Sequence, residues 1–419
     1  MRRPSTHDAI VIGAGPAGTS AALALARRGW AVAIVEKSAF PRRKVCGEYI
    51  SASNLALLDR LEIGDAWRAA AGPEIRRVGL FSGDTSIEAP MPGARSGSAA
   101  RDGFGRALGR DILDTLLLDA VRSAGAEVFQ PCRAVAVERD SDCQTVLIQA
   151  TGEKSSDEAT ILRAPVIVAA HGSWEPGPLP SQLGKSSRPS DLLGFKAHFT
   201  GSSLRPDLMP LLTFPGGYGG MVLADHGRMS ISCCIRRDML TRLRGSLARE
   251  RGGHVSAAEA VEHHIMATCR GVRDALAEAR LDGPWLAAGP IRPGIRAGYE
   301  ADIFRIGNAA GESHPIIAEG ISMALQSGWL LVQELGAAAS GQGEREAAGR
   351  RYEAAWRGLF STRVLAAEAI ARIALGPGGA ALMEAVVRNL PQALTLGARL
   401  SGKTKPIPGL ADGRVARGR

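Results

Sequence analysis

Several patterns that would decide a function are missing from this 419-residue sequence. Its six cysteines form no C-x-x-C pair and have no histidine spacing suited to zinc. An apolar run near the N-terminus is broken by glycines and followed by no cleavage site, and no other stretch is apolar enough to span a bilayer. We therefore expect a cytoplasmic protein with reduced thiols, no metal and no transmembrane segment.

The positive charge is unevenly spread. Of the net charge of +9, nearly half lies in the segment from Ser401 onward. We expect residues 401–419 to form a solvated, frayed basic tail, and we do not expect a nucleic-acid groove. The segment carries these charged residues: Lys403, Lys405, Arg414, Arg417 and Arg419, against Asp412.

The N-terminal stretch DAIVIGAGPAGTSAALALARRGWAVAIVEK reads as strand, tight turn, helix and strand. Gly13, Gly15 and Gly18 form G-x-G-x-x-G directly after the first strand. The first glycine makes the turn, the second lets the backbone approach a pyrophosphate, and the third lets helix and strand pack closely. The helix N-terminus offers free N–H groups to that phosphate. This context predicts a dinucleotide-binding site.

Glu36 ends the second strand, eighteen residues after Gly18. A carboxylate there accepts hydrogen bonds from an adenosine ribose and disfavours a 2′-phosphate. The site is therefore expected to take FAD or NAD, not NADP.

Three further segments bear on the choice between FAD and NAD. Arg110 heads an amphipathic helix and could be a surface charge or a cofactor clamp. APVIVAAHGSW reads as a buried strand that enters a turn. FRIGNAAGESHPIIAEGISMALQSGWLL reads as a strand, a turn of small residues and a helix that begins near Gly320.

Together these segments resemble the FAD-dependent family of aromatic hydroxylases and geranylgeranyl reductases, which have the para-hydroxybenzoate-hydroxylase-like fold. The resemblance implies an α/β protein: a Rossmann-type FAD-binding domain with a parallel sheet and crossover helices, an antiparallel-sheet substrate domain, and C-terminal helices. The expected layout is FAD-binding domain 1–75, 101–186 and 291–340; substrate domain 76–100 and 187–290; C-terminal helices 341–400; basic tail 401–419.

The resemblance also implies which residues hold a non-covalently bound FAD. The Gly13–Gly18 loop would hold the pyrophosphate, Glu36 the ribose, and Arg110 the ribityl-phosphate stretch. Gly320 and Ile321 would lie at the pyrimidine edge of the ring, where the helix N-terminus favours negative charge on reduced flavin. The full set of cofactor residues predicted in this way is Gly13, Gly15, Ala17, Gly18, Glu36, Lys37, Cys46, Gly47, Arg110, Ala134, Asn308, Gly320 and Ile321.

Two positions depart from the family pattern. Asn308 stands where the family usually has Asp; its amide oxygen can still accept from a ribityl hydroxyl, so Asn308→Asp is expected to be tolerated. His171 replaces the Asp of the hydroxylases' A-D-G-x-x-S motif, which puts a pyridine-nucleotide role of that motif in doubt.

FPRRKVCGEYIS contains a K-x-C-G core similar to that of the geranylgeranyl reductases, where the Cys and Gly lie beside the flavin. Glu48 could face substrate or form a structural salt bridge. The reductases' Y-x-W-x-F-P corresponds to LTFPGGYGG without the Trp, and the halogenases' W-x-W-x-I-P is absent. Halogenation is therefore not expected.

The substrate is expected between the flavin and the middle sheet, with Tyr49, Tyr218 and Pro315 as lining residues. His314 is the catalytic candidate, because a neutral imidazole could accept or orient a phenol's proton; it could equally cap the turn. The helices that contain Tyr352 and Trp356 could close a lipophilic pocket or only cap the domain.

The resemblance favours an NAD(P)H-dependent monooxygenase that hydroxylates a lipophilic or polyketide-like aromatic through a flavin C4a-hydroperoxide. Saturation of a polyprenyl double bond, and a flavin electron-transfer module without substrate, are the alternatives. The expected partner is a lipophilic small molecule; peripheral membrane contact is left open. The sequence does not predict the oligomeric state.

Overall fold

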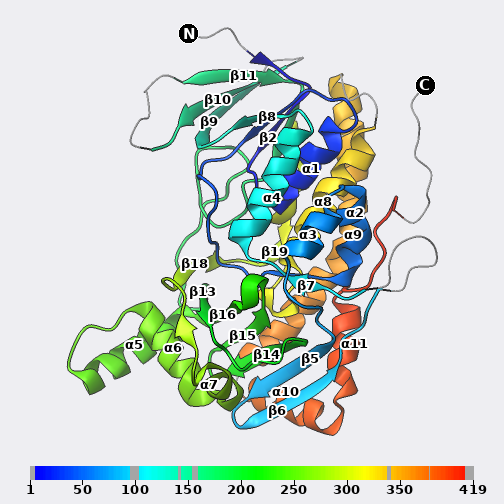
Figure 1. Cartoon of the computed structure of the whole chain (residues 1–419). Coiled ribbons are helices and arrows are strands. Elements are labelled where there is room, and N and C mark those ends of the chain that lie inside the picture. Colours follow the sequence, from blue (N-terminus) through cyan, green and yellow to red (C-terminus); the bar gives the residue numbers. More distant parts are fainter. Residues whose placement is uncertain are drawn as a thin grey trace.

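The computed structural model describes residues 5–94, 103–139, 143–152, 159–336, 341–376 and 378–410. Its centre is a six-stranded sheet of short, buried apolar strands in the order β20-β21-β12-β2-β3-β8, shown in the upper half of Figure 1. All neighbours are parallel except β20 and β21. The strands are β2 (Ala9–Ile12), β3 (Val32–Val35), β8 (Glu127–Phe129), β12 (Val166–Ala169), β20 (Tyr299–Glu300) and β21 (Ile303–Arg305).

Alternate residues of the central strands face two different layers. Ile10 and Ile12 pack toward a four-stranded sheet, whereas Ala9 and Val11 pack toward helices. This period of two is why the strands are apolar on both faces. The covering sheet has the order β1-β11-β10-β9, with β1 (Ser5–Thr6), β9 (Cys132–Arg139), β10 (Gln144–Ala150) and β11 (Thr160–Ala164).

Helices α1, α4 and α8 form the layer on the other face (Figure 1). Gly328 allows α1 and α8 to approach closely, because a Cβ there would lie 2.4 Å from the Ala17 carbonyl oxygen. The helices on this side are α1 (Pro16–Ala26), α2 (Leu55–Arg60), α3 (Gly64–Ala70), α4 (Arg110–Ser123) and α8 (Gly320–Leu335), with the short 3-10 helices Ala52–Asn54, Gly307–Ala309 and Pro315–Ile317.

A second, eight-stranded sheet lies below the first in Figure 1. It is antiparallel except between β5 and β14, and a hairpin around 225–228 joins β15 to β16. Phe195, Ala197 and Phe199 share one face and pack under the helices of residues 237–276. The strands are β5 (Arg77–Ser82), β6 (Thr85–Pro90), β13 (Leu192–Thr200), β14 (Leu208–Phe214), β15 (Gly217–Leu223), β16 (Met229–Arg236), β17 (Arg280–Leu281) and β18 (Leu286–Ile291).

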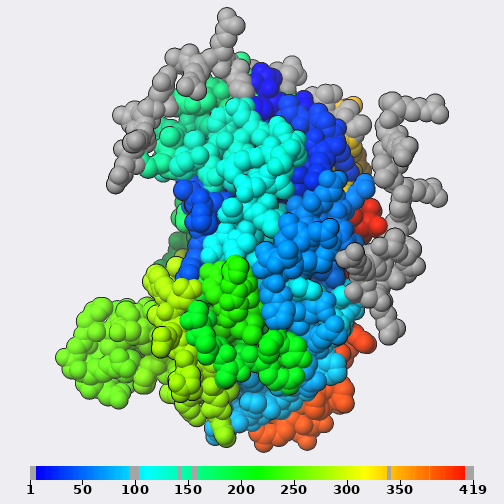
Figure 2. Space-filling model, in the orientation of Figure 1, coloured from blue at the N-terminus to red at the C-terminus, as the bar shows by residue number. Residues whose placement is uncertain are grey.

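The remaining strands and helices link or cover the two sheets. Helices α5 and α6 project from the body at the lower left of Figure 2. The helices are α5 (Arg237–Arg251), α6 (Ala257–Thr268), α7 (Arg270–Leu276), α9 (Gln342–Leu375), α10 (Gly379–Asn389) and α11 (Gln392–Leu400); the strand pairs are β4 (Tyr49–Ile50) with β7 (Arg106–Ala107), and β19 (Gly294–Ile295) with β22 (Gly311–Glu312).

The C-terminal segment corrects one expectation. Residues 401–410 are not a frayed tail: Ser401, Lys403 and Ile407 are buried. The Lys403 ammonium donates to Glu319 Oε1 at 2.9 Å and to the Ile317 carbonyl at 2.7 Å. A buried lysine needs such partners because desolvation of its charge is costly. The Lys403 ammonium, expected from the sequence to be solvated, therefore anchors residues 401–410 to the loop before α8. Residues 411–419 lie outside the described residues.

The α/β architecture predicted from the sequence is thus confirmed. Because β2, β3, β12 and β21 run parallel, their carboxyl ends meet at one edge of the sheet. Such an edge is where open α/β sheets bind their ligands. The loops that follow these strands are therefore the candidate ligand-binding region.

Candidate FAD-binding and active site

The loop after β2 contains two glycines that the backbone requires. Gly13 has φ +110°, and a Cβ there would lie 2.6 Å from the Ala170 carbonyl oxygen. A Cβ on Gly18 would lie 1.9 Å from the Gly13 carbonyl oxygen. Both contacts are too close for any side chain, so these glycines shape the turn from which α1 begins at Pro16.

Gly15 and Gly320 are different, because the protein leaves space in front of them. The nearest atom to a Cβ on Gly15 would be Arg110 Nη2, at 3.8 Å, and a Cβ on Gly320 would meet nothing within 4 Å. Each glycine stands at the N-terminal end of a helix, α1 or α8. The free N–H groups and positive dipole ends of two helices thus border space that side chains would fill. This arrangement fits a dinucleotide that carries a diphosphate.

Glu36 is buried and fixed beside the loop. Its Oε2 accepts from the Ala14 N–H and its Oε1 from the Ser38 N–H, both at 2.9 Å. The remaining lone pairs are available to ribose hydroxyls, as predicted for this carboxylate. Lys37, by contrast, forms an ion pair with Glu175 at the surface. Ala134 is buried in β9 and packs against the central strands.

Arg110 is not a surface charge. It is buried and forms a bidentate pair with Asp114, with nitrogen–oxygen distances of 2.8 and 2.7 Å. Arg42 lies 3.4 Å from the same carboxylate and 3.9 Å from that of Glu36. The pKa of Lys44 is lowered to about 8 by burial and by the nearby charges of Arg110 and Arg42. Three cations close to two carboxylates leave an excess of positive charge next to Gly15, which suits a diphosphate.

The second predicted loop is organised by Glu312. The Asn308 amide nitrogen donates to Glu312 Oε1 at 3.1 Å, and Ser173 Oγ and Trp174 Nε1 donate to the same carboxylate at 2.6 and 3.2 Å. Arg296 donates to the Asn308 carbonyl at 2.9 Å. With its nitrogen engaged, the Asn308 side chain presents its oxygen as an acceptor, which fits a ribityl hydroxyl.

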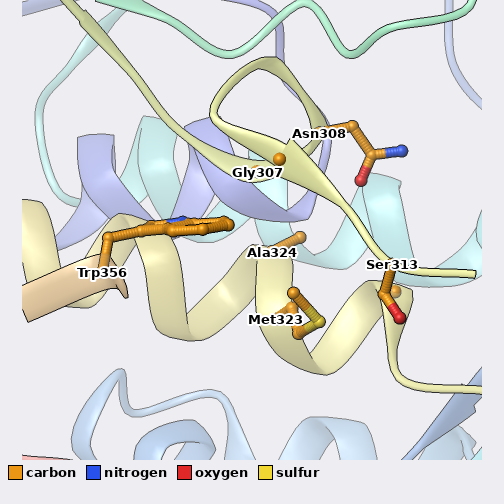
Figure 3. Close-up of a pocket in the computed structure, with 8 residues that line it drawn as sticks. Gly307, Asn308, Ser313, Met323, Ala324 and Trp356 are labelled. Carbon is orange, nitrogen blue, oxygen red and sulfur yellow. The ribbon is translucent and has the colours of Figure 1, made fainter. Parts of the chain in front are cut away.

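Asn308 and Gly320, predicted separately, line one small pocket (Figure 3). In Figure 3, Met323 and Ala324 of α8 lie along it, and Trp356 of α9 lies at the opposite end from Asn308. Helix α9 therefore contributes to the wall of this pocket as well as covering the domain. The lining residues are Gly307, Asn308, Gly311, Ser313, Gly320, Met323, Ala324 and Trp356.

The segment from Cys46 to Glu48 crosses above the second sheet. The Glu48 N–H donates to Cys46 Sγ at 3.4 Å, and a Cβ on Gly47 would lie 3.4 Å from Ser232 Oγ. Glu48 is fully buried, bound by Lys196 and by His198 Nε2, the latter at 2.8 Å. Burial opposes its ionisation, but the His198 hydrogen bond and the Lys196 charge outweigh this and lower its pKa to about 2. Glu48 therefore forms a structural salt bridge, one of the two roles expected for it from the sequence.

His314 and Tyr218 meet where the loop before α8 contacts β15. Tyr218 Oη and His314 Nδ1 are 2.5 Å apart, and both residues are buried. Burial lowers the pKa of His314 to about 4 and raises that of Tyr218. The imidazole is therefore neutral at pH 7. Its side chain does not cap the turn that begins at Pro315 and pairs with Tyr218 instead.

Tyr49 lies in a neighbouring cluster, not beside His314. Its ring is buried, and the Lys403 ammonium lies 5.0 Å from the ring centroid. Lys403 also binds Glu319, the residue directly before Gly320. Tyr49 thus packs against the Lys403 ammonium beside the residues that directly precede α8.

Sequence reasoning missed several residues of this site. Arg42 and Lys44 lie in the PRRK run that precedes the predicted Cys46. The basic charge of this run was a signal in the sequence that could have indicated phosphate binding. Asp114 and Glu312, also missed, lie only four residues from the predicted Arg110 and Asn308. Trp174 and Lys403 reach the site only through contacts between distant segments. Among the described residues, no group of three or more His, Cys, Asp or Glu is placed to hold a metal ion.

Comparison with known proteins decides the family. The chain matches the family described as FAD binding domain over residues 6–357. It belongs to that family. The fit of the glycines, Glu36 and the cationic cluster to a dinucleotide therefore applies to FAD, and the para-hydroxybenzoate-hydroxylase-like fold expected from the motifs is confirmed.

Individual relatives differ in what they do. A menaquinone reductase of Mycobacterium tuberculosis is 33% identical over 150 residues, which is 35% of this chain and 34% of that protein. This flavoprotein thus matches about a third of that relative's length. A digeranylgeranylglycerophospholipid reductase of Methanopyrus kandleri is 26% identical over 84% of this chain and 83% of its own. A flavin-dependent brominase has the same fold, with a TM-score of 0.72 at 17% identity, covering 95% of this chain and 94% of that chain.

Proposed function

We propose that this flavoprotein is an NAD(P)H-dependent monooxygenase that hydroxylates a lipophilic aromatic. When bound, FAD supplies the chemistry: it accepts two electrons from the pyridine nucleotide and passes them to dioxygen. The observation that carries the proposal is the neutral His314, held by Tyr218 in the loop before α8.

His314 has a role that its low pKa permits. When Nδ1–H donates to Tyr218 Oη, the Nε2 lone pair is free to accept from a phenolic hydroxyl. A base with a pKa of about 4 does not remove a proton from a resting phenol. The hydroxyl becomes far more acidic as the ring acquires oxygen, and the proton then moves to Nε2. His314 thus orients the phenol first and accepts its proton afterwards.

Reduction of a polyprenyl double bond is the second candidate, favoured by two observations. The relative aligned over most of its length is a prenyl-lipid reductase. In this chain, the Cys46 thiol lies beside Arg110 and next to the Gly47 backbone, which is where the resemblance places the flavin's neighbours. In such a reaction, a hydride (two electrons and one proton) and a second proton add to the double bond, and the Cys46 thiol is the group that could supply the second proton.

One assay separates these candidates. Purified holoprotein is mixed with NADH or NADPH, and nucleotide oxidation and oxygen uptake are followed with phenols, with prenyl lipids, and without additions. Monooxygenation predicts phenol-dependent oxygen uptake and a product that gains one oxygen atom. A prenyl-lipid product that gains two hydrogen atoms under anaerobic conditions would replace this proposal with the reductase. Reducible flavin without either product would leave an electron-transfer role.

A further inference from the structure

The large apolar side chains that remain exposed are concentrated at one end of the described chain. Ten of them have 40% or more of their surface accessible, and eight of the ten lie between residues 365 and 400. Leu400, at 69%, is the most exposed. We call this set the C-terminal apolar surface: Leu365, Ile370, Ile373, Leu382, Val386, Leu390, Leu396 and Leu400.

These side chains form stripes on amphipathic helices. Leu382 and Val386 lie four residues apart on α10, so they share one face, and Leu390 caps the C-terminal end of this helix. Leu396 and Leu400 are likewise four residues apart on α11. Other faces of these helices are already used, because Val387 of α10, and Leu394 and Ala398 of α11, pack in the cluster that covers the second sheet. The exposed stripes are therefore not needed to fold the domain.

Positive charge accompanies the apolar surface. From Arg363 to Lys405 the chain has six basic residues, of which Arg363 and Lys403 are buried and the other four are exposed, and two acidic ones, Glu368 and Glu384. Both carboxylates are paired, with Arg372 and Arg388 respectively. Arg399 and Lys405 are exposed at the end of α11, and the sequence continues with further arginines.

We propose that the C-terminal apolar surface docks onto a lipid bilayer that contains anionic phospholipids. Apolar stripes with flanking Lys and Arg are the pattern of helices that lie in the plane of a membrane interface. The apolar side chains enter the acyl boundary while the basic side chains meet the headgroups, which attract each cation near the surface. A second copy of the chain would place the same positive charges against each other, which disfavours that occupant. This proposal does not depend on which reaction the flavin performs.

The geometry of α9 and α10 also fits an interfacial position. Among the described residues, no single helix is long and apolar enough to cross a bilayer. Helices α9 and α10 reach that length and composition only as a pair bent by 109°. In Figure 1, α10 and α11 lie along the lower right end of the molecule, and Figure 2 shows that this end forms part of its outer surface.

A cleft opens beside the same helices. It measures about 670 Å³, and Arg399 at the end of α11 and Thr404 just after it line it together with Met91, Phe104 and the paired Arg76 and Glu74. Apolar side chains and Arg399 thus continue from the C-terminal apolar surface into the cleft. A bilayer docked on α11 would bring its lipids to this opening.

Vesicle flotation of the holoprotein tests the proposal. The probes are vesicles of phosphatidylcholine alone and of phosphatidylcholine mixed with phosphatidylglycerol. We expect binding to the mixed vesicles, and weaker binding at about 0.5 M NaCl, where charges are screened within a few Å. The variant Leu382→Ser/Val386→Ser/Leu390→Ser is expected to bind roughly tenfold or more weakly, because three apolar side chains no longer enter the bilayer.

A matched control uses the two exposed leucines outside the surface. Leu183→Ser/Leu281→Ser removes side chains of 44% and 47% exposure and should leave vesicle binding unchanged. Retained flavin absorbance shows that each variant is folded. The proposal is overturned if wild type does not float with anionic vesicles, or if both variants bind as wild type does. It is also overturned if the triple variant changes only the sedimentation of the protein alone, because the surface then joins two copies.

Discussion

The region around Gly15 and the second sheet differ in how far their charged groups are neutralised within the protein. Around Gly15, the protein leaves open space. Arg110, Arg42 and Lys44 next to it carry more positive charge than the nearby carboxylates neutralise. On the second sheet, Glu48 is already satisfied by Lys196 and His198. The first region is incomplete without an anionic ligand, whereas the second is complete by itself. Substitutions in the first should therefore change binding, and those in the second should change stability.

The largest expected effect is complete loss of FAD in Gly15→Val. The valine side chain would enter the space meant for the pyrophosphate, while the protein itself offers no close contact to a Cβ there. We expect a yellow wild type, and a colourless variant that remains folded by circular dichroism.

Two glycine variants sharpen this test. Gly184→Val, also at an open position, should keep its flavin. Gly18→Val should fail to fold, because its Cβ would overlap the Gly13 carbonyl. Flavin retained by Gly15→Val would show that the open space is not the cofactor site.

Glu48→Gln should cost about 3–5 kcal/mol of unfolding free energy, because it leaves Lys196 buried without a compensating charge. Urea denaturation of the two proteins measures the difference. Glu346→Gln, which removes the exposed partner of Arg350, is the control and should change stability by about 0–1 kcal/mol. Equal losses in the two variants would refute the contrast drawn between buried and exposed pairs.

Lowering the pH should reduce the difference in stability between wild type and Glu48→Gln. The pKa of Glu48 is about 2 in the folded protein, below its ordinary value of 4.5. Its contribution is therefore complete above about pH 5 and is lost as the pH falls toward 2. The difference in unfolding free energy between wild type and Glu48→Gln should shrink over this interval. A difference that stays constant would mean that the carboxylate is not held ionised.

His314→Gln lies at the boundary between the two regions. It should keep FAD and its reduction by NAD(P)H but slow product formation by about 100-fold, because the proton acceptor is lost. Tyr218→Phe keeps the imidazole but removes its anchor and should slow the reaction less. If His314→Gln forms product at the wild-type rate, the residue is structural and the reductase gains support.

Asn308 should produce the smallest effect and the most specific one. Asn308→Leu should weaken FAD binding by about 1–3 kcal/mol, roughly five- to over a hundred-fold, through loss of one hydrogen bond. The tolerance of Asn308→Asp expected from the sequence does not agree with the geometry, because the new carboxylate would face Glu312 at about the present 3.1 Å. We expect Asn308→Asp to weaken binding and added Glu312→Gln to restore it. Titration of apoprotein with FAD measures all three.

The features predicted correctly from the sequence are local ones. The turn at Gly13–Gly18, the helix that starts at Arg110 and the one that starts at Gly320 all formed where expected, since each is defined by neighbouring residues. The role of Glu312 could not be predicted, because three of its partners come from two other segments of the chain. The error at Lys403 has the same origin: its partner Glu319 is 84 residues away.

Lys403 also sets the order in which the site can be completed during synthesis. The Gly-rich loop at residues 13–18 leaves the ribosome well before Lys403, which lies 403 − 18 = 385 residues farther along the chain. At roughly 5–20 residues per second, some 20–80 seconds separate the two. During that interval the nascent chain has its phosphate-binding loop but lacks the ammonium that binds Ile317 and Glu319 directly before α8. The flavin site of this protein is therefore completed only after Lys403 has been synthesised.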